Sequence, residues 1–108
     1  MKPKHQIVFL LGKANGYLEK AMTPGKAVAE SWVDVAKAME VVAFCAGMAD
    51  ARAFWRSQRK TAATISGIAS YLLNLVLEGI RFESPCWTDG LKKVQLDIET
   101  LSRFGSFR

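Results

Sequence analysis

The sequence predicts an all-α protein, a four-helix bundle with short connections in which residues 1–108 form a single domain. Apolar residues recur every three or four positions over most of the chain, which is the period of an amphipathic helix. Thr-Pro at Thr23 and Ser-Pro at Ser84 mark helix starts, because the hydroxyl can cap free amides and proline fits the first turn. With 108 residues, 50% of them hydrophobic, the chain is long enough to bury one core.

The bundle is expected to be organised around a helix from Pro24 to about Gln58. Its apolar positions share one helical face, which consists of Val28, Trp32, Val35, Met39, Val42, Ala46, Ala49 and Ala53. From Val41 to Met48 the opposite face is apolar as well. We therefore expect this part of the helix to be buried on all sides.

The length of this helix and its small residues lead to two further predictions. An unbroken helix over these residues would be about 52 Å long, whereas a compact domain of this size has a radius of gyration of about 13 Å. We therefore expect either a bend or break near Gly47 or around Asp50, or last turns that project beyond the bundle. The spacing of Ala43, Gly47 and Ala51 indicates a flat stripe where a neighbouring helix packs closely.

A first helix is expected from about Lys4 to Ala21, where apolar residues again recur with helical spacing. The alternative is a short strand over Gln6–Leu11 followed by a turn, because Gly12 and Gly16 each weaken a helix by about 1 kcal/mol relative to alanine. If the segment is helical, these two glycines would let another backbone approach closely.

A third helix is expected from Thr61 to about Phe82 as the second central, largely apolar helix. The fourth begins at Ser84 or at Thr88 and is amphipathic. It ends near Phe104, with Gly105 as its C-terminal cap. The first and fourth helices would then cover the two central ones, since short connections favour antiparallel neighbours.

No charged residue occurs from Thr61 to Leu77, and this run approaches the length of a membrane span. Several of its residues are Thr, Ser, Asn or Ala, and Glu78 and Arg81 end it early, so a buried core helix is favoured over a span. A membrane-associated protein anchored by this segment is the third functional alternative. The apolar run from Ile7 to Leu11 is too short for a secretory signal.

The net charge of +5 is concentrated, above all, in residues 51–60. Arg52, Arg56, Arg59 and Lys60 are spaced i, i+4, i+7 and i+8, which would place them on one helical stripe flanked by Phe54 and Trp55. Guanidinium groups suit phosphate and an indole can stack on an unpaired base, so the stripe could bind nucleic acid. An acidic protein partner, or a solvated helix end, explains the same charges.

The residues offer little for catalysis or metal binding. Glu30 and Asp34 are one turn apart, but neighbouring lysines and the lack of a nearby histidine indicate surface ion pairing rather than a metal or acid-base site. His5 is the only histidine, and Cys86 could gain thiolate character at a helix start but is more simply a half-buried thiol. We expect no catalytic residue, metal, cofactor or small-molecule substrate.

The functional prediction follows from the apolar surplus. Two central helices that are apolar almost all round carry more such surface than a chain of this length can cover. We therefore expect a non-catalytic adaptor or accessory subunit that docks into a homo-oligomer or larger protein complex through Val41, Phe44, Met48 and Trp55. The alternative is a small nucleic-acid-binding protein that uses the basic stripe. Two cysteines, one of them Cys45 in an apolar helix, are typical of a cytoplasmic protein.

Overall fold

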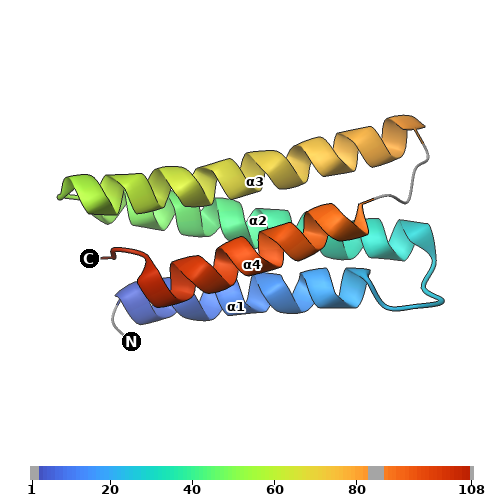
Figure 1. Ribbon diagram of the computed structural model, residues 1–108, viewed down its shortest axis with the longest axis horizontal. Coiled ribbons are helices and arrows are strands. Elements are labelled where there is room, and N and C mark those ends of the chain that lie inside the picture. Colours follow the sequence, from blue (N-terminus) through green and yellow to red (C-terminus); the bar gives the residue numbers. More distant parts are fainter. Residues whose placement is uncertain (1–2, 83–86, 108) are drawn as a thin grey trace.

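The computed structural model describes residues 3–82 and 87–107, which form four α-helices and contain no β-strand. The helices are α1 (Pro3–Ala21), α2 (Val28–Arg52), α3 (Arg56–Phe82) and α4 (Thr88–Phe104). They run alternately up and down along a molecule of 42 × 24 × 18 Å (Figure 1). The long axis matches the length of α3, which is about 40 Å at 1.5 Å per residue. The predicted all-α bundle is confirmed.

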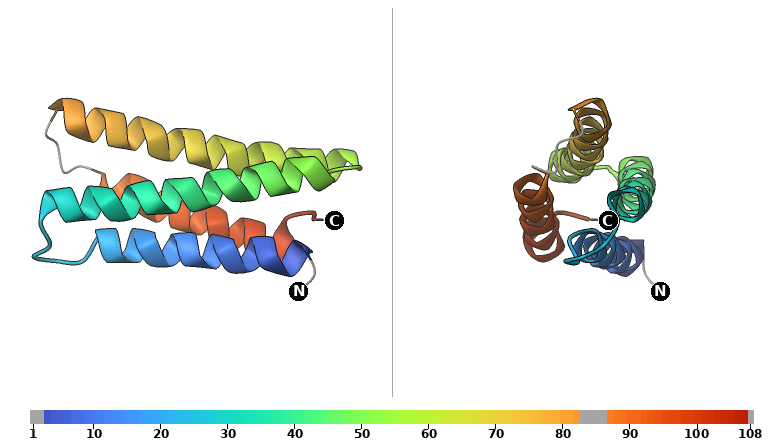
Figure 2. Two further views of the ribbon diagram at one scale, coloured as in Figure 1. Left: turned by 180° about the vertical axis from the view of Figure 1, so that it is seen from behind. Right: turned by 90° about the vertical axis from the view of Figure 1, so that its right-hand side faces the viewer.

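The four helices occupy the corners of the bundle. In the end-on view of Figure 2, α2 lies between α1 and α3 on one side, and α4 lies between them on the other. α2 packs closely on both neighbours, whereas α4 contacts α1 and α3 less extensively. The expected division into two central and two covering helices is therefore not confirmed, because every helix keeps an outer face.

The core is a continuous cluster of buried apolar side chains to which all four helices contribute. Leu11, Val42, Ile65, Leu72 and Leu91 are among its fully buried members. Each helix presents its buried residues at intervals of three or four, which is the period that the sequence pattern predicted. All four helices therefore share one hydrophobic core.

The buried face of α2 differs from the predicted one. The buried residues of this helix are Ser31, Asp34, Val35, Ala38, Val42, Cys45 and Ala49. Trp32, Met39 and Ala46 are only half-buried, and Val28 is exposed. The burial predicted on all sides between Val41 and Met48 is also wrong. A helix at a corner has only two flanking neighbours, so the outer face is left to solvent.

The start and the end of α2 also differ from the prediction. The helix begins at Val28 rather than Pro24, because the chain first turns through Gly25, whose φ of 80° lies in the left-handed region that favours glycine. It ends at Arg52, a little after the expected break at Gly47 or Asp50. The segment predicted as one long helix to about Gln58 thus contains the whole of α2, a turn, and the first turn of α3.

The predicted close approach of a neighbouring helix does not occur at the expected glycines. A Cβ added to Gly12, Gly16 or Gly47 would meet no atom within 4 Å, and the stripe of Ala43, Gly47 and Ala51 is exposed. The close approach occurs in α3 instead. A Cβ on Gly79 would lie 2.0 Å from Cζ2 of Trp32, so the indole lies directly on the α3 backbone.

The bounds of α1 and α4 agree with the prediction, whereas α3 ends at Phe82 as predicted but begins at Arg56, five residues before the expected Thr61. α1 is helical throughout, so the strand alternative for Gln6–Leu11 is wrong. α4 begins at Thr88 and ends at Phe104, and Gly105 is its C-cap, with its N–H donating to the Leu101 carbonyl at 2.8 Å. The predicted start at Ser84 lies outside the described residues.

Candidate functional site

Three of the four residues expected to bind a partner lie together on one side of α2. Val41, Phe44 and Met48 are spaced three and four residues apart, so they share a helical face, which we call the α2 face. Val41 and Met48 are half-buried and pack against the core, whereas Phe44 is 59% exposed. The α2 face is therefore an apolar surface that the described part of the chain leaves partly uncovered.

Trp55 does not lie on the α2 face. It belongs to the turn between α2 and α3, at the end of the bundle where α3 begins (Figure 1). Its indole is 65% exposed, and the Phe54 ring, 61% exposed, meets it edge to face at a centroid distance of 5.1 Å and an angle of 87°. The structure thus separates Trp55 from Val41, Phe44 and Met48.

A buried glutamine holds this turn in place. The Gln58 side-chain oxygen accepts hydrogen bonds from the backbone N–H of Phe54 at 2.8 Å and of Trp55 at 3.0 Å. Gln58 is the third residue of α3, the position from which a side chain reaches back to the free amides that precede a helix. Sequence reasoning missed this role, because it placed the end of one helix at Gln58 rather than the start of another.

The basic residues do not form one helical stripe. Arg52 ends α2, while Arg56, Arg59 and Lys60 lie in the first two turns of α3, so the turn at Ala53–Trp55 interrupts the predicted spacing. Arg52 is half-buried and donates to the Met48 carbonyl at 3.4 Å, whereas the other three side chains are exposed. The structure still brings the four cations to the same end of the bundle, because α2 ends and α3 begins there.

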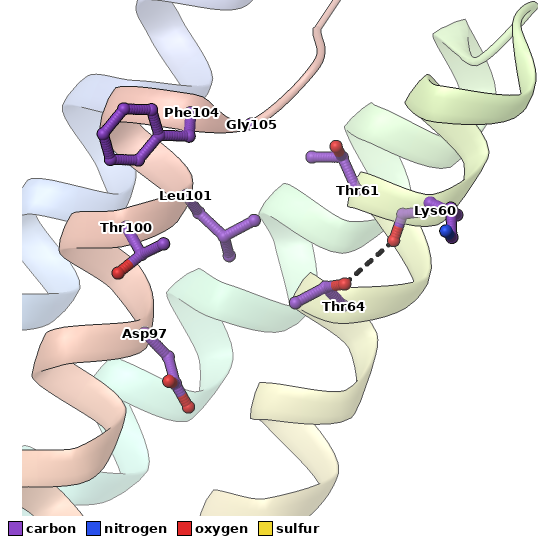
Figure 3. A pocket seen from close by; sticks show the side chains of 8 residues that line it. All are labelled: Lys60, Thr61, Thr64, Asp97, Thr100, Leu101, Phe104 and Gly105. Carbon is purple, nitrogen blue, oxygen red and sulfur yellow. Dashed lines mark hydrogen bonds between the residues drawn. The ribbon is translucent and has the colours of Figure 1, made fainter.

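The C-terminal segment is held at the same end of the bundle by its contacts with α3. The buried Thr61 hydroxyl accepts a hydrogen bond from the Ser106 N–H at 2.9 Å, and the Ser57 and Ser106 hydroxyls lie 3.1 Å apart. A groove of about 350 Å³ lies between the start of α3 and the end of α4. Lys60 lines it on the α3 side and Phe104 on the α4 side (Figure 3). Phe104 is 81% exposed, and Asp97 lies further along the groove.

One end of the molecule therefore gathers exposed aromatic rings and positive charge. We call this region the end surface; it consists of Phe54, Trp55, Phe104, Arg52, Arg56, Arg59, Lys60 and Arg103. Residues 51–60 contain four basic and no acidic side chains. Sequence reasoning did not place Phe104 in the end surface. The amphipathic pattern of α4 does not reveal that this helix ends beside the start of α3.

Glu30, Asp34 and the buried Cys45 belong neither to the α2 face nor to the end surface. Asp34 pairs with Lys26, as the predicted ion pairing requires, and Glu30 is exposed. Among the described residues no group of three or more His, Cys, Asp or Glu is placed to hold a metal ion. Burial raises the pKa of the Cys45 thiol to about 11. His5 is exposed on α1, and Cys86 lies outside the described residues.

The outward side of α3 is uncharged over most of its length. Its exposed residues include Gly67, Leu73 and Leu77, and 28% of its most apolar stretch is buried in the bundle. By length and composition alone, Arg56–Gly79 is the one described helix that could cross a membrane. The expected burial of this helix is therefore restricted to the face that meets α2 and α4.

No protein-family model matches the sequence, and searches among curated proteins and solved structures likewise give no match. The functional interpretation accordingly rests on the α2 face and the end surface.

Proposed function

We propose that the protein is a non-catalytic adaptor or accessory subunit that docks onto a protein partner through the α2 face. The observation that supports this function is the exposed Phe44 ring between the half-buried Val41 and Met48. An exposed aromatic ring flanked by half-buried apolar side chains is the kind of apolar surface that protein–protein contacts use. Trp55 lies outside this face, in the turn between α2 and α3.

A second copy of the chain is the partner that can be tested first. A symmetric dimer places the same patch of both copies against itself, so a single exposed phenylalanine would meet its own equivalent or its immediate surroundings. Aromatic side chains at the centre of such a patch commonly supply most of the binding free energy. Removal of the Phe44 ring should therefore weaken association without disturbing the core.

The experiment is light scattering during gel filtration over a range of protein concentrations. We expect the wild-type chain to associate and Phe44→Ser to shift the equilibrium toward the monomer. Leu96→Ser is the matched control, because Leu96 is an equally exposed apolar residue on α4, which lies diagonally across the bundle from α2. The proposal would be contradicted by a wild-type chain that stays monomeric and binds no more of an apolar dye than Phe44→Ser does.

A further inference from the structure

The end surface combines two features that are each weak alone. Phe54, Trp55 and Phe104 are each more than half exposed, and the segments that carry them, the turn between α2 and α3 and the end of α4, lie at the same end of the elongated molecule (Figure 1). Its five cations belong to the end of α2, the start of α3 and the end of α4, which lie at this same end. Tryptophan is enriched at the boundary between lipid headgroups and hydrocarbon, and arginine and lysine are attracted to anionic headgroups.

We propose that the end surface binds the surface of an anionic phospholipid bilayer, as a peripheral contact that leaves the bundle folded. The rings of Trp55, Phe54 and Phe104 would enter the headgroup region, and the arginines and Lys60 would contact the lipid phosphates. Stable attachment to a membrane requires two such signals together, one apolar and one electrostatic. This contact differs from a span through Thr61–Leu77, since it uses only the tip of the molecule.

The turn is held in place before any ligand arrives. Gln58 is buried and accepts from the amides of both Phe54 and Trp55, and the hydrogen bond from Ser106 to Thr61 holds the C-terminal segment against α3. A surface that is already ordered loses little conformational entropy on binding. The exposure of the rings is therefore a property of a hydrogen-bonded turn rather than of a loose loop.

Single-stranded nucleic acid is the competing ligand for the same chemistry. A strand needs a charged track with ring faces set for successive bases. Phe54 and Trp55 meet edge to face rather than in parallel, and the groove beside Lys60 leads toward Asp97, whose carboxylate repels phosphate. The cations are spread over three helix ends rather than along one track, and a flat, deformable bilayer matches that distribution better than a strand does.

The test is co-sedimentation of the full chain with vesicles of phosphatidylcholine alone or mixed with phosphatidylglycerol. We expect binding only to the anionic vesicles, weakened by salt. Arg56→Gln with Arg59→Gln should lower the affinity about 30-fold, from the usual contribution of two basic residues near an anionic surface. Lys20→Gln with Lys92→Gln removes the same charge from exposed sites at the opposite end and should leave the affinity unchanged.

Trp55 gives an independent readout, because Trp32 and Trp87 stack on each other at the other end of the bundle. Anionic vesicles should shift the tryptophan emission to shorter wavelength, and Trp55→Ser should abolish the shift. Phe44→Ser should leave both readouts unchanged, so failure of the α2 face and of the end surface are distinguishable.

Three results would overturn the inference. The first is an absence of co-sedimentation with anionic vesicles. The second is an equal loss of affinity in the Lys20 and Lys92 control, which would mean attraction by net charge alone. The third is tight, arginine-dependent binding of a single-stranded oligonucleotide at a salt concentration where vesicles do not bind, which would assign the end surface to nucleic acid.

Discussion

Replacement of Gly79 by alanine should destabilise the protein, although alanine is normally the better helix residue. The added Cβ would lie 2.0 Å from Cζ2 and 2.2 Å from Cη2 of Trp32. Ordinary van der Waals contact begins near 3.4 Å, so the indole must move by more than an ångström. Trp32 also stacks on Trp87 with ring centroids 4.5 Å apart, and a shift of that size would disrupt the stack.

The magnitude follows from three opposing contributions to the free energy of unfolding. Overpacking of a packed site costs about 1–3 kcal/mol, and loss of an aromatic pair costs about 0.5–1.5 kcal/mol. Alanine regains about 1 kcal/mol in helix propensity. The net expectation for Gly79→Ala is a loss of about 2 kcal/mol, which lowers the Tm by about 8–16 °C for a domain of this size.

Gly67→Ala in the same helix is the matched control, because a Cβ there would meet nothing within 4 Å. That variant should gain about 0.5–1 kcal/mol. Urea unfolding followed by circular dichroism at the helix band measures both. The double variant Trp32→Leu with Gly79→Ala should be less destabilised than the sum of its single changes, since leucine removes the clash. If Gly79→Ala gains as much stability as Gly67→Ala, Trp32 does not lie on the α3 backbone.

Three further outcomes are expected. Gln58→Ala should lose about 1 kcal/mol of stability in urea unfolding by freeing two backbone amides, whereas Gln58→Glu keeps the acceptor and should lose less. In a Cys86→Ser background at pH 8, iodoacetamide should alkylate Cys45 at least about 100-fold more slowly in the folded chain than in the unfolded chain. A pKa of about 11 leaves almost no thiolate at that pH. Equal rates would contradict the burial of Cys45. Thr61→Val should speed hydrogen exchange at the Ser106 amide, and unchanged protection there would mean that the Thr61 hydroxyl does not hold the C-terminal segment.

The same thiol predicts how stability depends on pH. Burial raises the pKa of Cys45 from 9.0 to about 11 in the folded state, so folding favours the protonated form. The stability that this group contributes is fully present below pH 9 and is lost as the pH rises toward 11. A Cys45→Ala variant should lose the part of the alkaline decline that belongs to this residue, at the cost of a smaller core side chain.

The sequence predicts the helices well because their apolar spacing is a local property. α1 and α4 begin and end within a few residues of the predicted positions, since their polar and apolar faces differ clearly. The apolar pattern of residues 24–58 continues across a chain reversal, and nothing local indicates the turn. The reversal depends on Gln58, whose side chain caps an α3 start that only the folded chain reveals.

The candidate site was predictable in composition but not in geometry. The charge cluster and its neighbouring aromatic residues were visible as residue types, but the exposure of Phe54 and Phe104 was not predicted. The predicted stripe was wrong because it assumed a single helix through Arg52 and Lys60. Contacts between distant segments, such as Ser106 with Thr61 and Trp32 with Gly79, have no local signal in a single sequence. They arise from the order in which the helices occupy the four corners.

The position of the apolar surplus follows from this arrangement. A helix at a corner buries the arc that faces its two neighbours, so apolar residues outside that arc must face solvent whatever their type. On the outer side of α2 these include Ala43, Phe44 and Gly47. Glycine and alanine expose little apolar surface, whereas phenylalanine exposes a ring. The surplus of α2 near its middle is thus concentrated at Phe44, and its replacement is expected to test the proposed docking without disturbing the core.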